Sequence, residues 1–138
     1  MFISESEKEV NEAIANYKIE NEVIVFKGDE KESILQSLQD IFVIGNPRVW
    51  WLSLKDKPTS YICNDEQSYK YIKNFFKEEE EVWFIVEDDE CLLYKTKIIN
   101  VINIIGDCSF FEYNIISKDY RKFLCENDHG EFLYIRRN

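Results

Sequence analysis

Glycine, proline and histidine are scarce in this sequence, which has four Gly, two Pro and a single His, His129, among its 138 residues. Few glycines and prolines leave little room for flexible linkers, and the 15% of aromatic residues is unlike a disordered chain. Four scattered glycines form neither of the glycine-rich phosphate-binding motifs. We therefore predict one globular domain over residues 1–138 and no cofactor.

Long apolar runs, a secretory signal and closely spaced cysteines are also missing. No apolar run approaches the roughly 20 residues that span a membrane, and the N-terminus MFISESEKEV is acidic, without the apolar segment of a signal peptide. The cysteines, none in a C-x-x-C pair, are Cys63, Cys91, Cys108 and Cys125. Because Cys91 and Cys125 lie in apolar runs, we expect small buried thiols, reduced in the cytoplasm, and no contact with a membrane.

Acidic residues dominate the charge: 27 Asp and Glu against 17 Lys and Arg give a formal net charge of −10. A surface of this charge repels phosphate backbones, so we expect no binding to nucleic acid. It keeps a protein soluble, and it attracts a basic protein partner.

Two N-terminal stretches have the apolar spacing of amphipathic helices. The first covers residues 5–18 and begins with a capping box of Ser4 and Glu7. Asp29 is the expected cap of the second, whose apolar stripe consists of Ile34, Leu35, Leu38, Ile41 and Phe42.

Two further helices are expected later in the chain. Asn64 or Asp65 would cap a third helix that ends near Lys77, with inward side chains at Tyr69, Ile72, Phe75 and Phe76. Thr96 would cap a fourth helix, although residues 97–105 are rich in β-branched side chains that favour a strand. The spacing and caps favour the helix, and both alternatives stay open.

Residues 48–54 (RVWWLSL) carry large apolar side chains on both faces of a strand, as is typical of a central strand. Residues 82–86 and 91–95 flank an acidic connection and predict a β-hairpin. Alternating runs separated by polar turns predict a three-stranded antiparallel meander over residues 110–116, 123–126 and 132–135.

Together these elements predict an α+β fold. We expect an antiparallel or mixed, curved sheet of about six strands, with the N-terminal and inserted helices packed mainly on one face. Which face of the sheet is exposed stays open.

Two acidic segments flank the strand predicted over residues 82–86. Because they flank the same strand, they should lie at its opposite ends and together create a negative surface for a basic partner. The second segment lacks the spacing of a calcium-binding loop. The candidate binding residues are Glu78, Glu79, Glu80, Glu81, Asp88, Asp89 and Glu90.

The turn that follows residues 123–126 holds the alternative site. Glu126, Asp128 and His129 could ligate a metal or serve a small hydrolase, with His129 as a general base oriented by Glu126. A structural zinc site needs about four ligands, and without a second histidine we assign no metal. The other interpretation is a local turn in which Asn127, Asp128 and Gly130 supply the turn conformation.

Three stretches resemble a group of small uncharacterised bacterial proteins: VWWLSL at 49–54, the Phe-x-Glu-Tyr run at 110–113 and LCENDH at 124–129. The resemblance covers about residues 48–135. The acidic composition and helix-first order are also similar to the SUKH-like superfamily of bacterial immunity proteins, although the Gly-rich segment usual late in that family is absent. That resemblance implies a toxin-neutralising or scaffold module, and it transfers no functional residue.

We therefore expect a non-enzymatic acidic binding protein, an immunity-type inhibitor of a basic toxin such as a nuclease. The alternatives are a small hydrolase or metal-dependent enzyme at the His129 turn, and a scaffold module without a ligand. Monomer and homodimer are both open.

Overall fold

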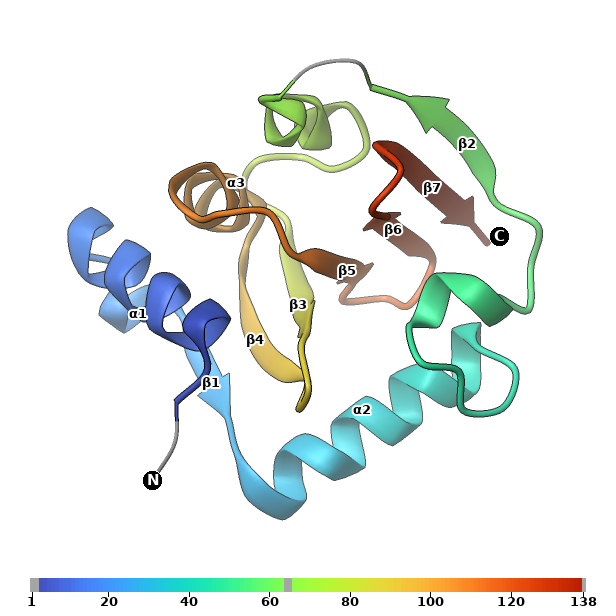
Figure 1. Ribbon diagram of the computed structural model, residues 1–138, viewed down its shortest axis with the longest axis horizontal. Helices are drawn as coiled ribbons and strands as arrows, with labels where there is room; N and C mark the ends of the chain where they lie inside the picture. Colours follow the sequence, from blue (N-terminus) through green and yellow to red (C-terminus); the bar gives the residue numbers. More distant parts are fainter. Residues whose placement is uncertain (1–2, 64–65, 138) are drawn as a thin grey trace.

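A seven-stranded antiparallel sheet forms the centre of the part of the chain that the computed structural model describes, residues 3–63 and 66–137. The strands lie in the order β1-β4-β3-β5-β6-β7-β2 (Figure 1). Their bounds are β1 (Ile24–Phe26), β2 (Thr59–Ile62), β3 (Glu81–Glu87), β4 (Leu92–Lys97), β5 (Glu112–Ser117), β6 (Lys122–Glu126) and β7 (Glu131–Arg136). The predicted α+β class is confirmed, with seven strands instead of about six and with an open sheet instead of a curled one.

Helices cover both faces of this sheet (Figure 1). The helices α1 (Glu5–Tyr17) and α3 (Ile98–Asp107) and the 3₁₀ helix η3 (Ser68–Asn74) pack on one face, as predicted for most of the helices. The helix α2 (Gly28–Phe42) and the 3₁₀ helix η2 (Trp50–Ser53) pack on the other. A short 3₁₀ helix, η1 (Glu20–Glu22), precedes β1.

The side chains of β3 alternate between two apolar cores. Phe84 is fully buried beneath α1 and α3, where it contacts the rings of Tyr94 and Tyr113. Its neighbour Ile85 is equally buried on the opposite face, together with Leu38 of α2. A strand that is apolar on both faces requires cover on both faces, and α2 supplies the second layer.

The predicted hairpin and meander are both present. β3 pairs with β4 from Glu81↔Lys97 to Val86↔Leu92, around the acidic turn. β5, β6 and β7 follow as an antiparallel meander with the register Asn114↔Cys125↔Leu133.

The strand predicted over residues 48–54 is wrong, because Trp50–Ser53 form the 3₁₀ helix η2. The segment turns back on the end of α2, where the Ile44 amide donates to the Ser53 carbonyl at 2.7 Å. The large apolar side chains have a different purpose: Trp50 is 4% exposed and fills the core under α2. The large apolar residues correctly indicated that this segment is buried, but a short 3₁₀ helix can bury such side chains as well as a strand can.

Of the three predicted helix N-caps that lie in the described residues, Ser4, Asp29 and Thr96, one is correct. Ser4 caps α1 by accepting a hydrogen bond from the Glu7 amide at 3.2 Å. Asp29 does not cap α2, because Lys27 occupies that position without a side-chain bond. Residues 98–107 are helical, so the open alternative resolves in favour of a helix. Thr96 lies in β4, however, and its hydroxyl accepts a hydrogen bond from the Asn100 side chain (Nδ2) at 2.9 Å, not from the helix backbone.

The third predicted helix is the 3₁₀ helix η3, and its proposed caps, Asn64 and Asp65, lie outside the described residues. Ile72 and Phe76 are buried, as predicted, and Tyr69 and Phe75 pack against the same core. The helix ends at Asn74, before the run of acids that would oppose its dipole.

Candidate functional site

The acidic segment before β3 is largely neutralised by lysines. Three of its four carboxylates form ion pairs: Glu79 with Lys97 at 2.8 Å, Glu80 with Lys122 at 2.9 Å, and Glu81 with Lys95 at 3.5 Å and Lys118 at 3.4 Å. The hydrogen bond and charge of Glu79 raise the pKa of Lys97. In the described chain, Glu78 is the acid of this run without an ion pair. The segment therefore presents much less net charge than its sequence indicates.

The acidic turn between β3 and β4 keeps more of its charge. Glu90 is paired with the buried Lys31 at 2.6 Å, and this contact lowers the pKa of Glu90. Neither Asp88 nor Asp89 forms an ion pair with another described residue, although Asp88 accepts a hydrogen bond from the Asp89 amide at 2.9 Å. One oxygen of Asp88 is buried and has no hydrogen-bond partner there.

Two surface hollows, of about 370 and 340 Å³, meet at this turn, and Asp89 and Glu90 line both. The first lies between the turn and α2, and its lining contains no lysine or arginine. It consists of Glu32, Leu35, Gln36, Gln39, Asn46, Trp50, Asp89, Glu90 and Cys91. The carboxylates and side-chain amide oxygens of this lining can accept hydrogen bonds from an ammonium or guanidinium group.

The two acidic segments do lie at opposite ends of β3, as predicted. β3 spans Glu81–Glu87, which separates them by about 20 Å. At that distance, mobile ions screen most of the interaction between exposed charges. The segments are therefore two separate surfaces, of which the β3–β4 turn is the more negative.

The side chains of the alternative site at the end of β6, Glu126, Asp128 and His129, do not point toward a common centre. Glu126 is buried on the η3 side of the sheet, where its carboxylate accepts hydrogen bonds from Tyr113 and Ser68, each at 2.8 Å. The His129 ring is largely exposed and packs edge-on against Trp51 of η2, on the opposite side. Asp128 is also exposed and lies 3.4 Å from the His129 ring.

A local turn accounts for the residues around His129. The Asn127 side chain accepts hydrogen bonds from the amides of His129 at 2.9 Å and Glu131 at 3.1 Å. Gly130 adopts a φ of +76°, a conformation that glycine reaches without strain. Within residues 3–63 and 66–137, no three His, Cys, Asp or Glu side chains form a group suited to a metal ion.

A half-buried carboxylate that the sequence did not single out, Glu87, lies below η2. Burial, with a smaller effect of the neighbouring Glu112, raises the pKa of Glu87 from 4.5 to about 7, against the lowering effects of the Trp50 amide, Asn114 and Arg48. The Trp50 amide donates to Glu87 at 3.1 Å, and the Trp51 indole donates to Glu112. Two carboxylates on adjacent strands therefore hold η2 against the sheet.

Asn114 completes this polar group from the same face of the sheet. Its side chain is fully buried and lies close enough to Glu87 to affect its pKa, yet neither of its polar atoms makes a hydrogen bond of good geometry with a described residue. The sequence did contain a signal: alternation from Ile85 continues to Glu87 and directs both side chains to the α2 face.

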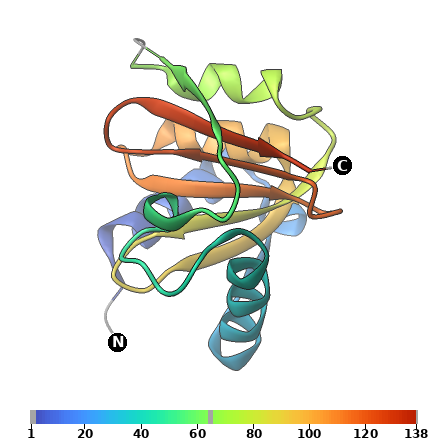
Figure 2. The ribbon, with the colours of Figure 1, turned by 90° about the vertical axis from the view of Figure 1, so that its right-hand side faces the viewer.

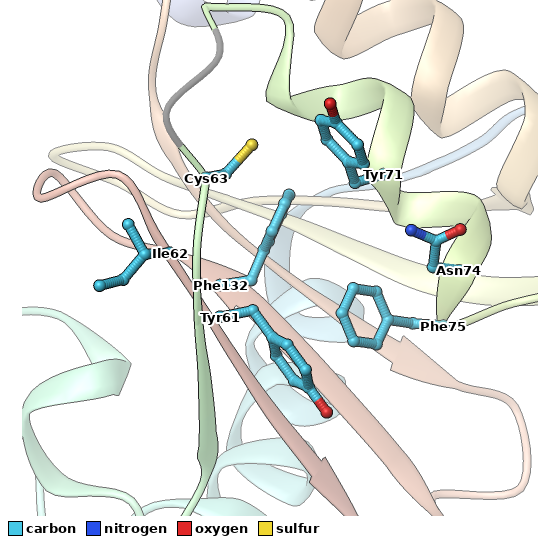
Figure 3. A pocket seen from close by; sticks show the side chains of 7 residues that line it. All are labelled: Tyr61, Ile62, Cys63, Tyr71, Asn74, Phe75 and Phe132. Carbon is cyan, nitrogen blue, oxygen red and sulfur yellow. The ribbon is translucent and has the colours of Figure 1, made fainter.

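An aromatic hollow of about 550 Å³ lies between β2 and η3 (Figure 3). The Phe75 ring stands within it, 5.2 Å from the ring of Tyr61 and 5.9 Å from that of Phe132. Its lining consists of Tyr61, Ile62, Cys63, Tyr71, Asn74, Phe75 and Phe132. Sequence reasoning missed this hollow because nothing in the sequence indicates that Tyr61 and the helix predicted to end near Lys77 lie side by side.

The four cysteines are free, and three of them lack the properties of nucleophiles. Burial raises the pKa of Cys91 to about 11 and of Cys108 to about 12, and it also raises that of the buried Cys125. A thiol with a raised pKa carries little thiolate at neutral pH. Among the helices of the described chain, none is long and apolar enough to cross a membrane.

Comparison with curated proteins and with solved structures found no match. A comparison with family models found one match, to a family of unknown function, DUF6756, over residues 5–137. This result agrees with the resemblance to small uncharacterised proteins, and it gives no support to a SUKH-like assignment. Because the match covers nearly the whole chain, the protein belongs to the DUF6756 family of unknown function.

Proposed function

We propose that the protein is a non-enzymatic binding protein of the bacterial cytosol that inhibits a basic protein, in the manner of an immunity protein. One observation carries the proposal: Asp88 and Asp89 of the β3–β4 turn have no ion pair within the described chain, and Asp89 lines a hollow whose other two carboxylates, Glu32 and Glu90, share the single cation of Lys31. Unpaired acids on a surface give up stability, and attraction of a basic partner is one reason to retain them.

The arrangement suits an arginine or lysine side chain of the partner. Asp89 supplies unpaired negative charge at the hollow, and Glu32 and Glu90 add two carboxylates that share one lysine, Lys31. Gln36 and Asn46 contribute side-chain amides to the same lining. A guanidinium group forms paired hydrogen bonds with such oxygens, and the displaced water is replaced by charge-assisted contacts.

The test compares two variants that remove the same charge from different ends of β3. Asp88→Asn with Asp89→Asn neutralises the proposed surface, and Glu78→Gln with Glu79→Gln is the matched control. Each protein, and the wild type, is immobilised and exposed to host cytosol, and the captured proteins are identified by mass spectrometry.

We expect the wild type and the control to retain a basic protein that the Asp88/Asp89 variant loses, with at least about a tenfold weaker affinity. The purified chain should also inhibit the activity of that protein. Equal capture by all three proteins would remove the β3–β4 turn as the binding surface. Capture without inhibition would leave a binding module and contradict the immunity role.

A further inference from the structure

The strand β2 forms an open edge of the sheet, next to the aromatic hollow. All four of its residues are exposed, and no element of the described chain lies beyond it (Figure 2). Its large apolar side chains include Ile62, which is 74% exposed, and Tyr61. Natural sheets normally protect such an edge, because an unpaired edge attracts another strand.

The outward hydrogen-bonding groups of β2 follow from its pairing with β7. The Cys63 amide donates to the Gly130 carbonyl at 3.1 Å, so the antiparallel pattern directs the main-chain groups of Tyr61 and Thr59 towards β7. The N–H and C=O groups of Ser60 and Ile62 therefore point away from the sheet. The structure shows no hydrogen bond that would occupy them within the described residues.

These groups are complementary to their own copies. If two β2 strands meet antiparallel about Tyr61, Ser60 of each copy lies opposite Ile62 of the other, and both pairs exchange N–H···O bonds. Tyr61 then faces its counterpart at a non-hydrogen-bonded position, where opposite side chains lie closest, on the face that carries the hollow and the Phe75 ring. All the outward groups of both strands are satisfied by this one register.

The charges at the two ends of β2 and β7 agree with the same arrangement. Lys57 and Arg136 lie at one end of this two-stranded ribbon, and Asp128 and Glu131 lie at the other. None of these four is ion-paired with a Lys, Arg, Asp or Glu of the described chain. An antiparallel two-fold contact brings the cationic end of one copy to the acidic end of the other.

The opposite edge of the sheet, at β1, lacks this complementarity. Ile24 and Val25 are exposed there. The nearby lysines, Lys27 and Lys97, are already paired with Glu7 and Glu79, whereas acids without an ion pair in the described chain stand on both sides of the strand: Glu20 and Glu22 before it, Asp29 and Glu30 after it. The same two-fold contact at β1 would bring acids against acids, which is unfavourable. The two edges therefore differ in charge pattern, although both carry apolar side chains.

We propose that the protein forms a homodimer through antiparallel pairing of β2 with β2 of a second copy, centred on Tyr61. The contact continues the sheet across the two-fold axis. It lies away from the β3–β4 turn, so it is independent of the proposed inhibitory function.

Sedimentation equilibrium of the full chain tests the pairing. We expect a dimer at concentrations up to about 100 μM, and at least about a tenfold weaker association for Ile62→Lys, which places a charge on the edge and leaves the β7 ladder intact. Val25→Lys is the matched control on the β1 edge and should leave the dimer unchanged. A monomeric wild type, or a dimer weakened only by Val25→Lys, overturns the proposal.

A charge exchange tests the antiparallel register. Lys57→Glu and Asp128→Lys should each weaken the dimer by at least about threefold, and the double variant should recover most of the loss. Circular dichroism and thermal melting confirm that each variant is folded. A folded double variant that associates no better than the single variants would refute the register and the proposal with it.

Discussion

The carboxyl group of Glu87 is held in an environment that favours its neutral form. It lies under Trp50 and beside Glu112, and burial raises its pKa to about 7. In the unfolded chain the same group has a pKa of about 4.5. Its contribution to folding is therefore fully present below pH 4.5 and is lost as the pH rises through 7, because only the unfolded chain ionises freely in that window.

The variant Glu87→Gln should remove this pH dependence. Glutamine keeps an oxygen that can accept from the Trp50 amide and cannot ionise. We expect the variant to be more stable than the wild type by about 2 kcal/mol at pH 8, with little difference at pH 4.5. Urea unfolding across this range measures the difference, and the exposed Glu79→Gln serves as the control. Parallel pH profiles for wild type and Glu87→Gln would contradict the assignment.

At the scale of elements, η2 shows what apolar patterning can and cannot reveal. As a strand, Trp50 and Leu52 would share one face and be buried alike. In the 3₁₀ helix they differ: Trp50 is 4% exposed and Leu52 is 49% exposed. Substituting each of these two residues therefore tests whether the segment is a 3₁₀ helix or a strand.

We expect Trp50→Ala to destabilise the protein by about 3–5 kcal/mol, because it empties part of the core under α2. Leu52→Ala should change the free energy of unfolding by no more than about 0.5 kcal/mol. Chemical denaturation of both variants measures the contrast. Similar losses for the two variants would restore the strand interpretation.

The sequence predicted the elements whose signals are local. The N-cap at Ser4, the hairpin around the acidic turn and the meander of β5–β7 all follow from spacing and turn residues, and all are present, although the Glu7 carboxylate that would complete a capping box pairs with Lys27 instead. It did not predict features that depend on distant partners. The Glu87–Glu112 pair, the exposed faces of η2 and the hollow beside β2 each require knowledge of which elements meet.

At the scale of the whole molecule, the net charge of −10 is unevenly neutralised. Lysines offset the acids before β3, whereas Asp88 and Asp89 keep their charge at the other end of that strand. Like charges on one molecule oppose compaction, and salt screens this effect. The unpaired acids should therefore reduce stability at low ionic strength.

The Asp88→Asn/Asp89→Asn variant should be more stable than the wild type by about 0.5 kcal/mol in low salt, with the difference fading in high salt. The Glu78→Gln/Glu79→Gln variant should show no such gain, since it also removes the ion pair with Lys97. Thermal unfolding at several NaCl concentrations distinguishes the two. A gain that persists in high salt would mean that charge repulsion is not its cause.

The order of the strands has a consequence for synthesis on the ribosome. Both edge strands come from the N-terminal half, yet their partners come from the C-terminal half: Ile24 pairs with Lys95, and Thr59 with Tyr134. The first half of the nascent chain thus emerges without the strands it needs, while β3–β7 follow as a nearly continuous local sequence. Folding should begin in this later, local part, because short chain closures form fastest. Until then the apolar side chains of α2 and Trp50 have no core to pack against, and exposed apolar surface of this kind favours aggregation.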